Sequence, residues 1–169
     1  MNFDNFTVKA QEAVQSAVRR AASGGQQAIT PLHLLAGVLS VGENITQYLF
    51  GKLGVDGRRL SDAVGSELAR LPRVSGGEPY LDREANDVLQ RATELAGKEG
   101  DTFVGLEPLL LALLLVKSTA SAMLKDAGVG EQELRTAIRE LRGGQKATSA
   151  SSEDTYQALS KYARDLVAE

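Results

Sequence analysis

The chain repeats the same plan of residues at an interval of 75 positions, first from Gly25 to Val41 and again from Gly100 to Val116. In each copy a glycine is followed by a short loop with a β-branched residue, Ile29 or Val104, and then by an apolar run with a proline near its start. The first turn of a helix tolerates proline, because the N–H group that proline lacks has no partner within the helix there. Leucine also favours helices, so both runs are predicted to be helices rather than strands.

The second apolar run predicts a helix that is surrounded by protein. Its leucines follow the helical spacing i, i+3, i+4, i+7, i+8, at Leu106, Leu109, Leu110, Leu113 and Leu114. Further apolar residues, including Leu111 and Leu115, fill the other faces, so no wide polar side remains. We expect this helix to be the central one. Asp101 and Glu107 at its entrance are then fixed beside whatever apolar surface stays open.

The helices around these two runs repeat as well. An apolar stripe of helical period begins after Thr7, which is suited to cap a helix, and a matching stripe begins after Asp82. Gly54-Val55 corresponds to Gly128-Val129, now with an offset of 74. The prediction is an all-α fold of two tandem four-helix repeats, packed with pseudo-twofold symmetry into one globular domain. A unit of about 65 residues would be only marginally stable alone.

The predicted boundaries are repeat one at about 6–71, a connector at 72–80 and repeat two at about 81–142, within one domain of residues 1–142. The connector contains too many glycines and prolines for regular structure. Residues 143–153 are small and polar, which is typical of a flexible linker. From 154 to 169 a helical pattern resumes and stops without a C-terminal signal, which predicts the start of a helix that leads into a further module.

Composition excludes several kinds of site. The absence of cysteine excludes disulfides, thiolate metal sites and a thiol nucleophile. A net charge of -3 with both signs interspersed gives no basic surface for nucleic acid. The longest apolar run is far shorter than the roughly 20 residues of a membrane span, and the first residues lack the profile of a signal peptide, so a cytoplasmic protein is predicted. His33 is the only histidine, so we expect a packed side chain rather than a zinc ligand.

Several separated motifs together resemble the Clp amino-terminal repeat domain of the ring-forming AAA+ unfoldases: Phe6-Thr7-x-x-Ala10, Thr30-Pro31-x-His33-Leu34-Leu35 and the Gly54-Val55 turn. Others look like the ClpB-type bacterial disaggregases within that family: Arg70-Leu71-Pro72, Leu141-Arg142-Gly143-Gly144 and the pattern from Tyr156 to Leu166. The resemblance covers the whole chain. It implies a substrate-recruiting accessory domain, tethered to the first ATPase module of a ring that threads unfolded or aggregated polypeptides through its pore.

For the full-length protein, the resemblance implies a homohexameric stress-response chaperone that uses ATP and Mg²⁺ and works with an Hsp70-type chaperone. The present chain carries no Gly-x-x-x-x-Gly-Lys-Ser/Thr motif, so it is expected to bind no cofactor and not to hydrolyse ATP. By itself it is expected to be a monomer. One alternative is a ClpC- or ClpA-type domain, which docks adaptor proteins and feeds a protease. Another is a domain that only stabilises the hexamer, although a long polar linker argues against rigid contacts with the ring.

In the family, polar residues at the start of the first helix and at the entry to the second central helix are associated with substrate handling. By motif match these positions are Thr7, Asp101 and Glu107. Carboxylates beside a shallow apolar groove can bind the N–H groups or basic side chains of an extended peptide. The residues suggested for the lining of such a groove are Val88, Leu89 and Leu106, with packing in the core as the alternative.

Each of the three polar residues also has a simpler structural explanation. Thr7 can cap a helix, Asp101 can cap a loop, and Glu107 can complement the positive end of a helix. A further alternative is that Asp101 and Glu107 form a catalytic acid–base pair. Such a pair needs a deep pocket and usually other convergent polar groups, for which the sequence gives no signal, so the chain is expected not to be an enzyme.

Overall fold

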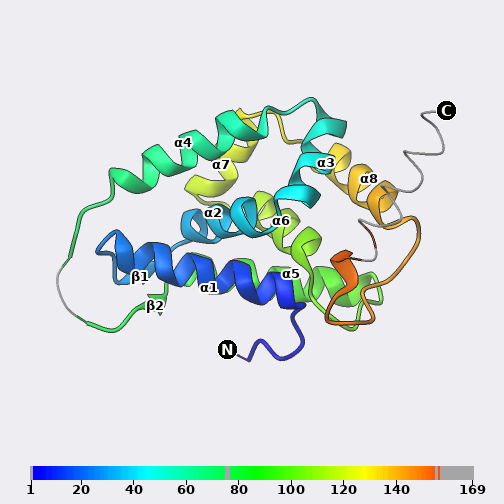
Figure 1. Ribbon diagram of the computed structural model, residues 1–169, viewed down its shortest axis with the longest axis horizontal. Coiled ribbons are helices and arrows are strands. Elements are labelled where there is room, and N and C mark those ends of the chain that lie inside the picture. The colour runs from blue at the N-terminus through cyan, green and yellow to red at the C-terminus, as the bar shows by residue number, and fades with distance from the viewer. Residues whose placement is uncertain (1, 75–76, 155, 157–169) are drawn as a thin grey trace.

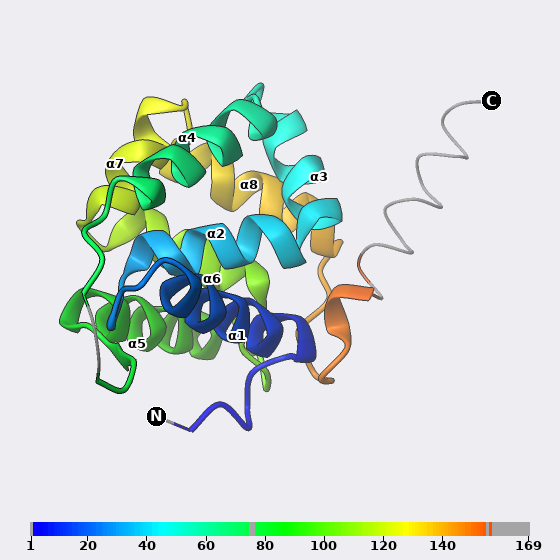
Figure 2. The same cartoon turned by 60° about the vertical axis from the view of Figure 1, so that its left-hand side comes forward.

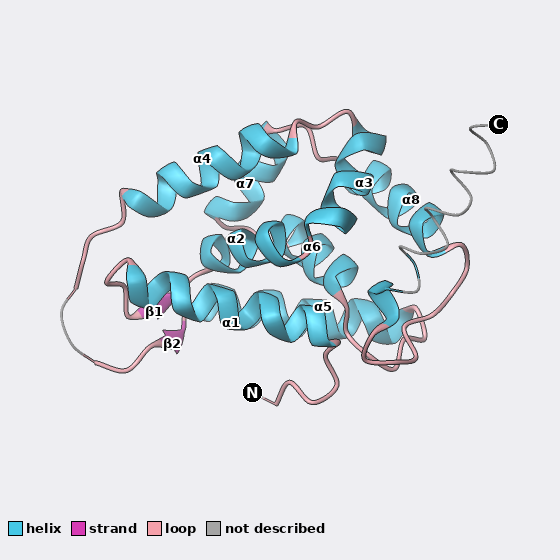
Figure 3. Cartoon of the chain, in the orientation of Figure 1, coloured by secondary structure: helices cyan, strands magenta, loops and turns pink. Residues whose placement is uncertain are grey.

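The structure is a computed structural model that describes residues 2–74, 77–154 and 156. Within these residues the chain forms eight α-helices and two strands of two residues each, which confirms the prediction of an all-α fold (Figures 1 and 3). The helices are α1 (Val8–Ser23), α2 (Pro31–Val41), α3 (Glu43–Leu53), α4 (Gly57–Ala69), α5 (Arg83–Lys98), α6 (Leu106–Leu115), α7 (Thr119–Asp126) and α8 (Glu131–Arg142). The strands are β1 (Ala28–Ile29) and β2 (Tyr80–Leu81).

Most helices begin where a side chain can accept a hydrogen bond from the exposed N–H groups of the first turn. Thr7 caps α1 and Asp82 caps α5, as predicted, and Thr30 caps α2 together with the ring of His33. Like α3 and α8, the central helix α6 has no such side-chain cap. It begins after Gly105, which has no side chain that could act as a cap.

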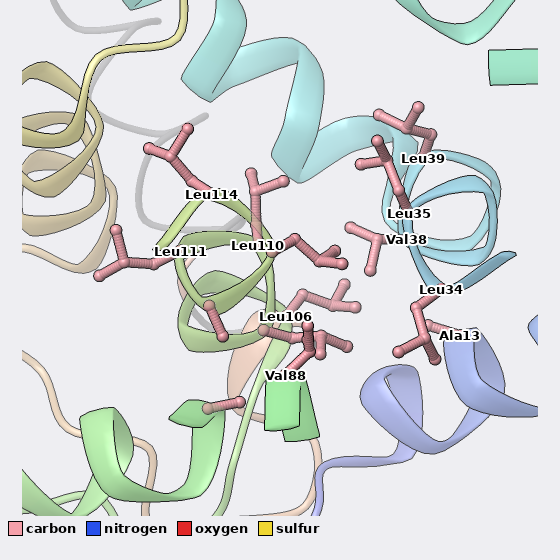
Figure 4. Packing of buried hydrophobic residues seen from close by; sticks show 14 of the residues in the cluster. Ala13, Leu34, Leu35, Val38, Leu39, Val88, Leu106, Leu110, Leu111 and Leu114 are labelled. Carbon is pink, nitrogen blue, oxygen red and sulfur yellow. The ribbon is translucent and has the colours of Figure 1, made fainter. Parts of the chain in front are cut away.

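Helices α2 and α6 form the middle of the molecule, as expected from the two apolar runs. Every residue is buried from Pro31 to Leu39 in α2 and from Leu106 to Leu114 in α6. Figure 2 shows α1 and α5 below this central pair and α3, α4, α7 and α8 above it. In Figure 4 the side chains of Leu110 and Val38 lie between the two central helices.

Among the described residues, no single helix is both long and apolar enough to cross a bilayer. In the part of the chain that the structure describes, α6 and α7 taken together are long and apolar enough, but they are bent by 96° relative to each other.

Short backbone pairings show the pseudo-twofold relation of the repeats. β1 pairs with β2 in parallel, so that Ile29 lies opposite Leu81, and an isolated parallel bridge joins Phe6 to Val104. Adding 75 to Phe6 gives Leu81, and adding 75 to Ile29 gives Val104, so each pairing maps onto the other when the repeats are exchanged. The third and fourth helices follow the same rule, because α3 packs against α8 and α7 packs against α4. The two repeats therefore share one core.

The segments between and after the repeats differ from expectation. The connector, predicted to lack regular structure, ends in β2 at Tyr80, which is held by pairing with a distant segment rather than by its own sequence. Residues 145–153, which were predicted to belong to a flexible linker, lie together with Asp154 against the domain beside the start of α1 (Figure 2). We call residues 145–154 the docked segment. Most of the helix predicted from 154 onward lies outside the described residues.

The docked segment begins in the way the connector does. After α4, Arg73 packs on Gly25, and after α8, Lys146 packs on Gly100. Both glycines have positive φ angles, +74° and +79°, which a residue with a side chain rarely adopts. The start of the docked segment is thus the second copy of a feature of the repeat.

Candidate functional site

The three polar residues singled out by the resemblance lie in one buried group of side chains. We call this group the polar cluster; its members are Thr7, Asp101, Glu107, Arg142, Glu153 and Tyr156. They come from the N-cap of α1, the loop after α5, the first turn of α6, the last residue of α8 and the chain that follows α8. The cluster therefore joins both repeats to the docked segment.

Glu153 supplies the cap that α6 lacks. Its Oε2 atom accepts a hydrogen bond from the N–H group of Leu106 at 3.0 Å and another from the Thr7 hydroxyl at 2.6 Å. Gly105 makes this approach possible, because a Cβ atom there would lie 2.9 Å from the same oxygen. A carboxylate at this place also interacts favourably with the partial positive charge at the start of a helix.

Arg142 holds the other half of the polar cluster together. Its Nη2 atom donates hydrogen bonds to Asp101 Oδ1 at 2.6 Å and to the Tyr156 hydroxyl at 3.1 Å. Its guanidinium lies 5.1 Å from the centre of the Tyr156 ring, within the range of a cation–π contact. Glu107 is less well paired, because its Oε1 atom lies 3.7 Å from Arg142 Nε.

Burial and crowding of negative charge shift the pKa values in the polar cluster. The pKa of Glu107 is raised from 4.5 to about 7, first by burial and then by the charge of Glu153, while Arg142 acts in the opposite direction. Burial also raises the pKa of Glu153, against the hydrogen bond from Thr7. For Arg142, burial alone would lower the pKa, but the hydrogen bonds with Asp101 and Tyr156 raise it overall.

The structure buries every residue that the sequence suggested for contact with a peptide. Thr7 is fully buried, and the side chains of Asp101 and Glu107 are each only 1% exposed. The suggested groove residues lie in the hydrophobic core instead of on the surface: Val88, Leu89 and Leu106. Local helical spacing could not separate these core positions from an exposed apolar face, because α6 is apolar on all sides and the single apolar face of α5 could face either the core or a groove.

The polar cluster does not have the geometry of a catalytic acid–base pair. The nearest Asp101 oxygen is bound to Arg142 and to the N–H group of Ala147, and Glu107 is covered on all sides. The raised pKa of Glu107 follows from that burial. His33 is likewise a buried helix cap, and among residues 2–74, 77–154 and 156 no group of acidic or histidine side chains is arranged to bind a metal ion.

An apolar groove opens beside the polar cluster, between α5, α6 and α8. It has a volume of about 370 Å³, and its apolar lining consists of Leu95, Pro108, Leu111 and Ile138. Polar residues at its rim include Glu99, Arg135, Arg139 and residues 144–146 of the chain after α8. Asp101 and Arg142 also reach this lining, so the groove and the polar cluster are contiguous.

The sequence contains a signal for this groove. Leu111 lies outside the main leucine stripe of α6, on the face that also carries Pro108. At the equivalent place in repeat one, the hollow is lined by Arg20 where repeat two has Leu95, and by Gly65 where repeat two has Arg139. The two repeats therefore have different surfaces, and only repeat two presents this apolar lining.

Comparison with known proteins agrees with the fold and with the sequence motifs. The Clp repeat (R) N-terminal domain family matches residues 5–127. The ClpB chaperone of Bacteroides thetaiotaomicron is 60% identical over 166 residues, and that of Porphyromonas gingivalis is 49% identical over 166 residues. Each alignment covers 98% of this chain but 19% of the relative, so the chain spans about a fifth of the length of these chaperones.

Solved structures show the same fold at lower identity. The Hsp104 N-terminal domain from Candida albicans superimposes with a TM-score of 0.79 at 24% identity, over 89% of this chain and 99% of that one. The N-terminal domain of the caseinolytic protease associated chaperone ClpD from Arabidopsis thaliana gives 0.65 at 22% identity, over 85% and 98%. The chain thus belongs to the Clp repeat N-terminal domain family, in the form carried by ClpB chaperones.

Proposed function

We propose that this domain recruits unfolded or aggregated polypeptides for an ATP-dependent disaggregase of the ClpB type, by taking their apolar side chains into the groove between α5, α6 and α8. The observation that carries the proposal is the groove itself, an open apolar hollow with charged residues at its rim. An extended segment of an unfolded chain presents both apolar side chains and free backbone N–H groups, which fit such a surface.

A groove of this size favours weak and unselective binding. Its apolar lining consists of four side chains, which can bury only a small part of the about 1,600 Å² that stable complexes bury. Weak contacts suit a recruiting domain, because a bound segment has to be released for threading. In the homohexamer that we propose for the full-length protein, with ATP and Mg²⁺ at its ATPase modules and an Hsp70-type chaperone as partner, repeated grooves raise the effective concentration of binding sites.

Docking of adaptor proteins for a protease, as in ClpC- or ClpA-type unfoldases, is the second candidate. The structural likeness to the ClpD domain keeps this role open at the level of the fold. The 60% identity to a ClpB chaperone favours the disaggregase.

The proposal predicts that a charge in the groove weakens client binding. Leu95→Arg introduces the residue that repeat one carries at the equivalent place, Arg20, so the side chain is compatible with this fold. We expect the affinity for a permanently unfolded, fluorescently labelled protein to fall about tenfold, because a desolvated guanidinium disfavours apolar side chains nearby. Fluorescence anisotropy measures the affinity, and thermal unfolding checks that the variant is folded.

Val74→Arg is the matched control. Val74 is an exposed apolar residue of the connector, 57% accessible, and lies outside the groove. Its substitution adds the same charge and should leave the affinity unchanged. Equal affinity of Leu95→Arg and the unsubstituted chain would refute binding in the groove.

A further inference from the structure

The docked segment is bound to the domain by the residues that were first suggested for contact with clients. We infer that the polar cluster holds the docked segment reversibly in place, and that Thr7, Asp101 and Glu107 influence client binding through the position of this segment rather than by touching the client. The inference rests on the proposed function, because the docked segment forms part of the groove wall.

Backbone hydrogen bonds define where the segment lies. The N–H groups of Thr102 and Phe103 both donate to the carbonyl of Ala147, at 2.8 and 2.9 Å, and the N–H group of Val8 donates to the carbonyl of Ala150 at 2.9 Å. These donors lie in the loop before α6 and in the first turn of α1, where no helical partner is available. The docked segment therefore satisfies N–H groups that its release would return to water.

Side chains of the polar cluster fix the two ends of the segment. Asp101 accepts a hydrogen bond from the N–H group of Ala147 at 2.9 Å, and its partner Arg142 keeps the carboxylate in place. At the other end, Thr7 and the start of α6 bind the carboxylate of Glu153. Thr7 and Asp101 thus act as positioning residues for the docked segment.

Docking also brings negative charges together, which costs free energy. A small change can therefore release the docked segment. The carboxylates of Asp101 and Glu107 lie 2.6 and 3.7 Å from the single guanidinium of Arg142, and the charge of Glu153 acts on Glu107 as well. The Oε2 atoms of Glu107 and Glu153 lie 3.0 and 2.9 Å from the position that a Cβ atom on Gly105 would take. Within the described part of the chain, both oxygens of Glu107 and one of Glu153 have no hydrogen-bond partner. Buried charges without partners are unfavourable. Glu107 therefore opposes docking, whereas Thr7 and Asp101 favour it.

Docking shapes the groove directly. Gln145 and Lys146 of the docked segment line the groove, and Lys146 donates a hydrogen bond from Nζ to the carbonyl of Glu99 at 2.8 Å. Release of the docked segment removes this wall and exposes Asp101 and Arg142. The groove presented to a client thus depends on whether the segment is docked.

The test is amide hydrogen exchange on the 169-residue chain with Glu153→Ala. We expect exchange about tenfold or more faster at Val8, Thr102 and Phe103, whose N–H groups bind the docked segment, while amides in the middle of α2 keep their protection. Client affinity, measured with the labelled unfolded protein, should change with it. Asp154→Ala is the matched control, because Asp154 is the next residue and its side chain is 65% exposed and forms a long ion pair of 3.9 Å with Lys9. It should leave both readouts unchanged.

Three outcomes would overturn the inference. Unchanged exchange at the three amides would show that Glu153 does not hold the segment. Faster exchange throughout the core would make Glu153 a general stabilising residue. Local release with unchanged client affinity would separate the segment from the groove. Failure of the proposed function looks different, because Leu95→Arg would then bind the client normally whatever the exchange pattern.

Discussion

At the scale of single residues, Thr7 of the polar cluster makes one contact that is local in the sequence and one that is not. Thr7 caps α1 through Ala10, as its position in the sequence predicts, and its hydroxyl also donates to Glu153, which lies 146 positions away. The first contact is local and could be predicted from spacing. The second exists only because the end of repeat two returns to the start of repeat one.

The raised pKa of Glu107 predicts that the stability of the domain depends on pH. This pKa is raised from 4.5 to about 7 in the folded state, so between these values the native protein keeps a proton that the unfolded chain releases. The contribution of protonated Glu107 to the free energy of unfolding is fully present below pH 4.5 and is lost as the pH rises through about 7. The expected loss is on the order of 3 kcal/mol at most. Arg142 stays charged over this range, and Asp101, Glu153 and Tyr156 are the other polar side chains that face the same space.

The measurement compares the free energy of unfolding of Glu107→Gln with that of the unsubstituted chain in urea, at pH 5 and at pH 8. Glutamine does not titrate, so the variant should gain stability relative to the unsubstituted chain as the pH rises. A difference that is the same at both pH values would contradict the assigned pKa.

At the scale of helices, the close approach of α1 and α2 depends on a residue without a side chain. A Cβ atom on Gly37 would lie 2.2 Å from the carbonyl oxygen of Ala13, inside the contact distance of the two atoms. The backbone of α1 would have to move, because that oxygen belongs to the helix itself. The sequence showed Gly37 only as an interruption of an apolar run.

We therefore expect Gly37→Ala to destabilise the domain by about 1 to 3 kcal/mol through overpacking. Gly51→Ala is the control, since Gly51 also lies within a helix but has nothing within 4 Å of the added atom. That variant should be more stable by about 0.5 to 1 kcal/mol, because alanine favours helices more than glycine does. Thermal and urea unfolding measure both. Similar effects of the two substitutions would show that α1 and α2 are not in tight contact.

At the scale of the whole molecule, the two repeats stabilise each other. α3 packs on α8 and α4 packs on α7, and β1 is paired only with β2 from the other side of the connector. Each repeat alone would expose the faces that these contacts cover. The pseudo-twofold arrangement therefore follows from the repeated sequence, and each repeat also needs it to cover these faces.

The corresponding prediction is that residues 1–74 do not fold as a stable monomer, whereas the complete chain unfolds in one cooperative transition. Circular dichroism and calorimetry distinguish the cases. Two separate transitions in the complete chain, or a well-dispersed NMR spectrum from residues 1–74 as a monomer, would show that the repeats are independent.

The sequence by itself determined the helices, their order, several of their caps and the relation between the two repeats. These features depend on residues within a few turns of one another or on a repeated pattern, so they can be read along the chain. Only the tertiary structure decided that Thr7, Asp101 and Glu107 are buried, that residues 145–154 are docked on them, and that the groove is lined by Leu95 and Pro108. The reason is that burial and hydrogen bonding between distant segments depend on which elements become neighbours, and local spacing carries no information about that.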